Sequence, residues 1–185
     1  MRWKLKSLKD IKENLNKINV EMSSRIVCFT GNRPQKLPWG FNETDVRFIK
    51  TKKIVRQKIV RAIKSGYYIF LCGMALGFDM MCAEIILELK KKYKHIKLIG
   101  AIPCKNQSER WAKEQKDRYE EIIKKLDGIR CIYDKYISGC MQERNKFMVN
   151  NSSLVIAFFN GSSGGTKNTI DYALKQGVKV EIIKP

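Results

Sequence analysis

The 185-residue sequence is poor in histidine, in acidic side chains and in long apolar runs. It has one His, and its 18 Asp and Glu residues face 37 Lys and Arg residues, so the formal net charge is +19 at pH 7. No apolar run reaches the roughly 18 residues that cross a bilayer, and we expect no membrane span. The charge indicates either a polyanionic or phosphorylated partner or a lysine-rich solvated surface.

The six cysteines include no C-x-x-C pair, and one His leaves too few ligands for a zinc site. We therefore expect reduced, mostly buried thiols, no metal and no cofactor. The first residues, 1–6, lack the apolar core of a secretory signal. These observations together predict a cytoplasmic protein.

Residues 1–22 form a separable, basic and imperfectly amphipathic extension to a domain spanning 23–185. This extension has three alternative interpretations: a helix docked on the domain, an oligomer contact, or a helix on a membrane surface. We favour docking, because Asp10, Glu13 and Glu21 dilute the charge that a membrane helix needs. Its apolar residues exceed the needs of the core, and we predict a homodimer or a tetramer.

From residue 25 onward, apolar strands alternate with helical patterns. This alternation predicts an α/β fold: a Rossmann-like, doubly wound and mostly parallel sheet with helices on both faces. The expected strands are 25–30, 67–72, 96–102, 129–133, 153–159 and 178–183. The expected helices are 43–65, 78–94, 106–126, 140–151 and 166–176.

Three of the strands run into glycine-rich loops, at 31–40, 73–79 and 160–166. Glycine allows the backbone to approach a phosphate closely, and the free N–H groups of a following helix point toward it. In an open α/β sheet, ligands bind outside the carboxyl ends of the strands. We therefore expect all three loops to meet at one anion-binding edge.

Two carboxylates could carry chemistry near the second loop. Asp79 stands where the loop enters its helix, where it could accept hydrogen bonds from a ribose or a base or simply favour the helix dipole. Glu84 lies about 140° further round the helix, so the two do not form one acid/base pair. Arg144 could hold a phosphate, and the neighbouring Asn145 could bind a base or ribose.

Other candidates follow the first and third strands. Pro103, Gln107 and Trp111 come after the third strand, and Trp111 could stack on a base or pack into the core. Arg33 and Trp39 lie in the first loop, which is long enough to cover a ligand.

From about residue 25 to the end, the chain resembles the SLOG superfamily of Rossmann-like proteins, which takes its name from the Smf/DprA and LOG proteins. Its YpsA-like branch, DUF1273, is the most similar. The motifs that carry the resemblance are Thr30-Gly-Asn-Arg-Pro34, Gly73-Met-Ala-Leu-Gly77-Phe-Asp79 with Ala83-Glu84, Ile102-Pro103 with Gln107 and Trp111, Arg144-Asn145, and Gly164-Gly165-Thr166.

The resemblance implies that a nucleotide or nucleotide-derived ligand, such as an ADP-ribose derivative or a cyclic nucleotide, binds at the sheet edge for sensing or sequestration. The implied binding residues are Thr30, Gly31, Arg33, Gly73, Gly77, Asp79, Pro103, Gln107, Trp111, Arg144, Asn145, Gly164, Gly165 and Thr166.

Two alternatives stay open. LOG enzymes hydrolyse nucleotide N-glycosides with an Arg, which Arg144 resembles, and a Glu, whose position holds Thr169 here. A hydrolase would therefore need Asp79 or Glu84 as its carboxylate, with Arg144 as the third candidate catalytic residue. The second alternative is DprA-like binding of single-stranded nucleic acid. We do not favour nucleic acid as the partner.

Overall fold

The computed structural model describes residues 25–185, and strands and helices alternate along this part of the chain. The strands are β1 (Ile26–Gly31), β2 (Ile69–Cys72), β3 (Lys97–Cys104), β4 (Gly128–Tyr133), β5 (Leu154–Phe158) and β6 (Lys179–Ile183). The helices are the 3-10 turn η1 (Pro34–Lys36), then α2 (Val46–Lys64), α3 (Phe78–Leu89), α4 (Lys113–Ile123), α5 (Cys140–Asn150) and α6 (Gly165–Lys175).

The strands form one sheet in the order β4-β3-β2-β1-β5-β6, and each neighbouring pair is parallel. From β1 the chain adds β2, β3 and β4 on one side, and then crosses to the other side of β1 to add β5 and β6. The direction of winding therefore reverses between β1 and β5. Gly31 pairs with Phe158 at the carboxyl ends of these two strands, which is where open α/β sheets bind ligands.

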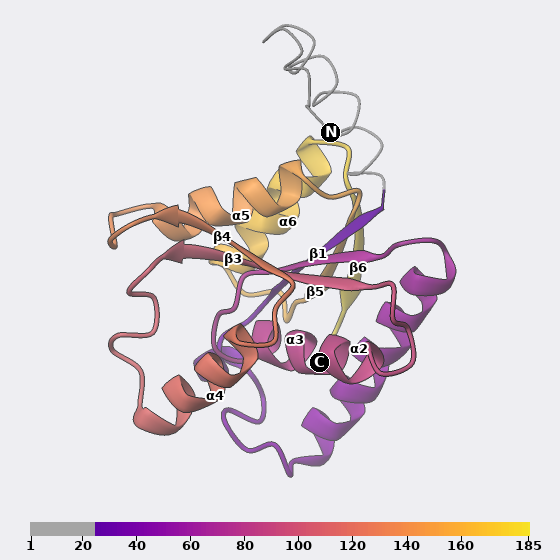
Figure 1. The fold of residues 1–185 in the computed structure, drawn as a ribbon, viewed down its shortest axis with the longest axis horizontal. Coiled ribbons are helices and arrows are strands. Elements are labelled where there is room, and N and C mark those ends of the chain that lie inside the picture. The colour runs from indigo at the N-terminus through magenta and orange to yellow at the C-terminus, as the bar shows by residue number, and fades with distance from the viewer. Residues whose placement is uncertain (1–24) are drawn as a thin grey trace, which may run out of the picture.

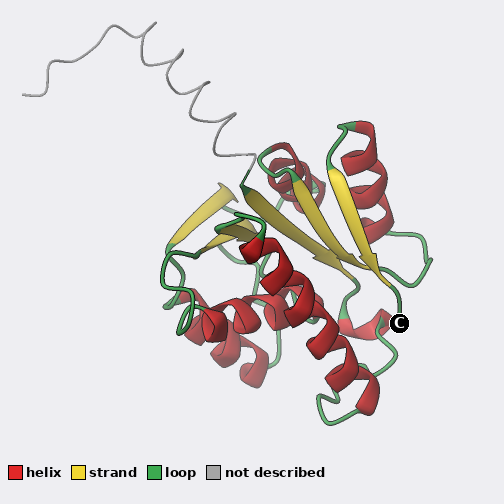
Figure 2. Cartoon of the chain, turned by 90° about the vertical axis from the view of Figure 1, so that its right-hand side faces the viewer, coloured by secondary structure: helices red, strands yellow, loops and turns green. Residues whose placement is uncertain are grey.

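Helices cover both faces of the sheet. Figure 1 shows α2, α3 and α4 on one face and α5 and α6 on the other, and Figure 2 shows the sheet between these layers. Right-handed crossovers require this change of face when the winding reverses. The structure confirms the predicted α/β Rossmann-like fold with helices on both faces.

The central strands β1, β2 and β5 are buried on both sides, which explains why they read as continuous apolar runs. Along β1, Val27 and Phe29 pack into the core with α2, α3 and α4. The alternate residues Ile26 and Cys28 enter the smaller core with α5 and α6. All six cysteines lie in the described residues as free thiols, and five of them are buried.

One expected helix begins later than its pattern indicated. Residues 106–126 were expected to be helical, but α4 begins at Lys113 and residues 105–111 form turns. The side-chain amide of Gln107 donates to the carbonyl of Met74 at 2.8 Å, so this segment is held by the loop after β2. A contact between residues so far apart in the sequence leaves no trace in the helical pattern.

The expected extension, 1–22, lies outside the described residues. Its docking, its boundary at residue 23 and the homodimer or tetramer therefore stay predictions. Within 25–185, no helix combines the length and the apolar character that crossing a membrane requires.

The core predicts a clear contrast between two isoleucines of α2. Ile59 is fully buried, whereas Ile49 is 56% exposed. We expect Ile59→Ala to lower the free energy of unfolding by about 2–5 kcal/mol, through lost burial and a residual cavity. Ile49→Ala should stay within about 0.5 kcal/mol of the parent. Urea unfolding of both variants tests this, and equal losses would contradict the packing described.

Candidate binding site at the switch point

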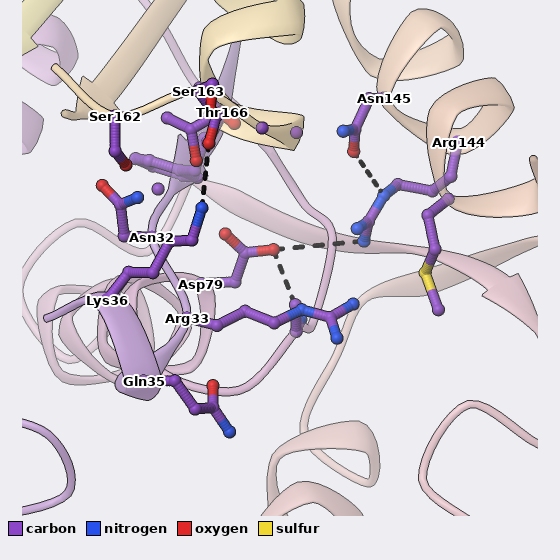
Figure 3. Close-up of a pocket in the computed structure, with 17 residues that line it drawn as sticks. Asn32, Arg33, Gln35, Lys36, Asp79, Arg144, Asn145, Ser162, Ser163 and Thr166 are labelled. Carbon is purple, nitrogen blue, oxygen red and sulfur yellow. Dashed lines mark hydrogen bonds and ion pairs between the residues drawn. The ribbon is translucent and has the colours of Figure 1, made fainter.

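The loops that follow β1 and β5 meet over a cavity of about 260 Å³, which we call the switch-point cavity. Residues 30–33, Gln35 and Lys36 line it from the end of β1 and the first loop, and residues 162–166 line it from the second loop. Figure 3 shows Asp79 between Lys36 of the first loop and Arg144. The switch-point cavity is therefore the place at the sheet edge where these glycine-rich loops meet.

The second loop delivers the N-terminus of α6 to the cavity. Gly164 precedes the helix with a φ of 133°, a conformation that side-chain-bearing residues rarely adopt. No side chain among the described residues caps this end of α6. The N–H groups of its first turn have no acceptors within the helix, so they are available to an anion in the cavity.

Arg144 reaches the cavity from α5 and is only 5% exposed. Its Nη1 donates to the carbonyl of Gly73, directly after β2, and at 3.4 Å to that of Ala101, within β3. Its Nε donates to Oδ1 of Asn145 at 2.8 Å. A Cβ atom on residue 73 would overlap the guanidinium, so glycine is required where Arg144 lies on the backbone.

Asp79 lies opposite Arg144, in the first turn of α3, and is 6% exposed. Its Oδ2 lies 4.0 Å from Nη1 of Arg144 and accepts the N–H of Ala75 at 3.3 Å. Burial raises the pKa of Asp79, and Arg144 and the Ala75 N–H offset part of this rise. Burial likewise lowers the pKa of Arg144, against the attraction of Asp79.

The loops around the cavity are tied to each other. Nζ of Lys36 donates to the carbonyl of Ser163 at 2.8 Å, and Nδ2 of Asn160 donates to the carbonyl of Lys36 at 3.1 Å. Arg33, Lys36 and Arg144 bring three cationic groups to the cavity wall, against the carboxylate of Asp79. This excess of positive charge favours an anionic ligand.

A short chain of hydrogen bonds joins α5 to the start of α6. Nδ2 of Asn145 donates to Oγ1 of Thr169 at 2.9 Å, and that hydroxyl donates to the carbonyl of Gly165 at 2.7 Å. Because Asn145 also accepts from Arg144, the chain fixes the guanidinium relative to the glycine-rich loop.

Most residues expected to bind a ligand lie around two adjoining cavities. The switch-point cavity is lined by Thr30, Gly31, Arg33, Asp79, Arg144, Asn145, Gly164, Gly165 and Thr166. A neighbouring cavity of about 340 Å³, which we call the Trp111 cavity, is lined by Gln107, Trp111 and, again, Arg33.

Besides Trp39, which is buried in the core, four expected residues line neither cavity. Gly73 holds Arg144 through its carbonyl, Gly77 begins α3 with a φ of 89°, and Pro103 is buried within β3. The fourth, Glu84, points to α4 instead of the switch-point cavity. Its two oxygens accept from Nε and Nη2 of Arg118 at 2.7 and 2.6 Å.

Several residues of the cavity wall were not expected from the sequence. These are Phe29, Asn32, Gln35, Lys36, Ala75, Met141, Ser162 and Ser163. Most belong to the glycine-rich loops that were recognised as segments, so their loop membership was the available signal. Among residues 25–185, no three His, Cys, Asp or Glu side chains gather as metal ligands would.

Comparison with known proteins agrees with this architecture. Residues 27–183 match the model of the YspA SLOG family. The chain belongs to the YspA SLOG family. A UPF0398 protein of Brevibacillus brevis is 32% identical over 128 residues, which are 68% of each chain. The uncharacterized SPbeta prophage-derived protein YoqJ of Bacillus subtilis is 37% identical over 124 residues, or 60% of this chain and 72% of that protein.

Two solved structures share the fold of this YspA SLOG domain. DNA processing protein A of Helicobacter pylori, described with a single-stranded DNA binding mode, superposes with a TM-score of 0.60 at 20% identity. DprA of Streptococcus pneumoniae gives the same TM-score at 16% identity. Each match covers 89% of this chain, but 66% and 51% of those longer chains respectively.

The buried carboxyl predicts a specific pH dependence of stability. Folding raises the pKa of Asp79 above its ordinary value of 3.8. When the pH rises above 3.8, Asp79 therefore loses its proton in the unfolded chain but keeps it in the folded protein. The contribution of Asp79 to stability therefore falls with rising pH. We expect the difference in unfolding free energy, parent minus Asp79→Asn, to decrease from about pH 4 upward. Urea titrations across this range measure it, and a flat or rising difference would contradict the burial of Asp79.

Proposed function

We propose that this protein binds the phosphate of a nucleotide or nucleotide-derived ligand in the switch-point cavity. One observation carries the proposal: the uncapped N-terminus of α6, Lys36 and the buried Arg144 converge on a single cavity where the winding of the sheet reverses. Helix N–H groups and guanidinium groups both suit phosphate oxygens. Membership of the YspA SLOG family supports a nucleotide-type ligand over an unrelated anion.

Within this class we favour a sensing or sequestering role for ligands such as ADP-ribose derivatives and cyclic nucleotides. The chain of hydrogen bonds from Gly73 through Arg144 and Asn145 to Thr169 holds these polar groups in place before a ligand arrives. Such preorganisation lowers the cost of ordering on binding.

Ligand binding should stabilise the fold. At a ligand concentration near one hundred times Kd, we expect about 2.7 kcal/mol of stabilisation, which raises the Tm by several degrees. Thermal-shift screening of AMP, ADP, ADP-ribose and cyclic mono- and dinucleotides, followed by calorimetry, measures this. If none of these compounds raises the Tm, the proposal is wrong.

A lysine comparison tests the location of the site. Lys36→Ala removes a cationic group from the cavity wall, and we expect nucleotide binding about tenfold or more weaker, as for the loss of a charge-assisted hydrogen bond. Lys53→Ala, on the exposed side of α2, removes the same charge away from that cavity and should change Kd less than twofold. Equal effects of the two substitutions would indicate only a general attraction by the net charge.

Single-stranded nucleic acid is a second candidate, because the net charge is +19 and the fold is shared with the DprA structures. If an oligonucleotide binds, the logarithm of the affinity should fall with the logarithm of salt concentration, by about 0.7 for each phosphate contact. Fluorescence anisotropy over a salt series measures this slope. Binding that disappears near physiological salt would reduce this candidate to nonspecific attraction.

A further inference from the structure

The Trp111 cavity lies directly beside the switch-point cavity. Arg33, Ala75 and Met141 line both, so these residues form a shared wall and one ligand can extend across it. The two volumes, about 260 and 340 Å³, together fall within the range of small-molecule sites.

The two cavities differ in chemistry. The switch-point cavity offers cationic groups and helix N–H groups, whereas the Trp111 cavity has the rings of Trp111 and Tyr136 in its wall. Packing holds the ring of Trp111, and a hydrogen bond holds the backbone of Tyr136. Trp111 packs edge-to-face on Tyr119 with centroids 5.3 Å apart, and the backbone N–H of Tyr136 donates to Oδ1 of Asn106 at 3.0 Å. Tyr136 is 62% exposed, so its ring is accessible to a planar partner.

A buried polar group in the Trp111 cavity wall also indicates a ligand. Gln107 is 9% exposed, and its Nε2 donates to the carbonyl of Met74, which orients the amide. Its Oε1 is buried and has no hydrogen-bond partner within the described residues. Buried acceptors are normally paired, so an unpaired one in a cavity wall points to an N–H donor that arrives with a ligand. The bases of adenine, guanine and cytosine nucleotides carry such donors.

The geometry points to a two-part site, an inference that rests on the proposed function. The phosphate of the nucleotide lies in the switch-point cavity, and its base lies in the Trp111 cavity against the rings of Trp111 and Tyr136. Arg33 stands at the junction, where its guanidinium contacts both parts of the ligand. Trp111 and Tyr136 are therefore the residues that distinguish a nucleotide from a simple sugar phosphate.

A second cavity also adjoins the switch-point cavity, but it fits a base less well. It is a cavity of about 150 Å³ between α5 and α6, which shares Asn145 and Gly165 with the switch-point cavity. Its aromatic residue, Tyr172, already donates its hydroxyl to Oδ1 of Asn150 at 2.9 Å. This cavity is less than half the volume of the Trp111 cavity, and its tyrosine serves as a matched control.

Calorimetry with AMP, ADP, ADP-ribose and ribose 5-phosphate tests the two-part site in the full chain. Loss of a stacking partner should weaken binding of the three nucleotides by at least about fivefold in Tyr136→Leu and in Trp111→Leu. Ribose 5-phosphate has no base, so its affinity should be the same in both variants as in the parent. Tyr172→Leu should change every Kd less than twofold. Tyr136→Leu alters an exposed side chain and keeps the test valid if Trp111→Leu fails to fold.

Three results would overturn the inference in distinguishable ways. If nucleotides bind the parent, but Tyr172→Leu weakens them and Tyr136→Leu does not, the base lies between α5 and α6 and the proposed function stands. If Tyr136→Leu weakens ribose 5-phosphate as much as the nucleotides, the tyrosine shapes the switch-point cavity instead of contacting a base. If no nucleotide binds the parent protein, the proposed function and the two-part site fail together.

Discussion

The contact between Arg144 and the carbonyl of Gly73 is the constraint on which the architecture of the site depends. Arg144 comes from α5, in one helical layer, and its guanidinium crosses the sheet edge to meet Asp79 at the start of α3, in the other layer. Arg144 therefore joins the two layers to the backbone of Gly73 and of β3, and Asn145 and Thr169 extend this connection to the start of α6. This contact is possible because residue 73 has no Cβ.

Stability alone does not explain such an arrangement. Taking a guanidinium and a carboxylate out of water costs several kcal/mol for each ion, and their attraction rarely exceeds this cost. The directions of the pKa shifts agree with this cost of burial. Burial raises the pKa of Asp79 and lowers that of Arg144, although the two groups attract each other. At 4.0 Å the two groups are also too far apart for a direct hydrogen bond. A poorly compensated pair in the wall of a cavity at the sheet edge is more economically explained by function, since perturbed groups gather at functional sites.

The sequence was sufficient to predict the elements but not how they pack in space. Apolar runs such as 153–159, bounded by polar and glycine residues, identify strands buried on both faces, and the glycine-rich loops identify the edge at which a ligand can bind. Strand order cannot be read from alternation, so the pairing of β1 with β5, which places the loops at 31–40 and 160–166 together, had to come from the structure. The late start of α4 was hidden for the same reason, because Gln107 bonds to Met74 across 33 residues.

Thr169 bears on whether the site holds its ligand or cleaves it. The resemblance to LOG enzymes places a catalytic glutamate at this position, where a carboxylate would act on the glycosidic bond. The hydroxyl of Thr169 is instead engaged twice, accepting from Asn145 and donating to Gly165, so it aligns α5 with the start of α6. Glu84 is held by Arg118, which leaves Asp79 as the one carboxylate among the described residues of the switch-point cavity wall. Because Oδ2 of Asp79 lies beside Arg144 and accepts the N–H of Ala75, this oxygen takes part in holding the loop after β2. Thr169 and Glu84 are thus engaged with other protein groups, so general acid–base chemistry in this cavity would depend on Asp79.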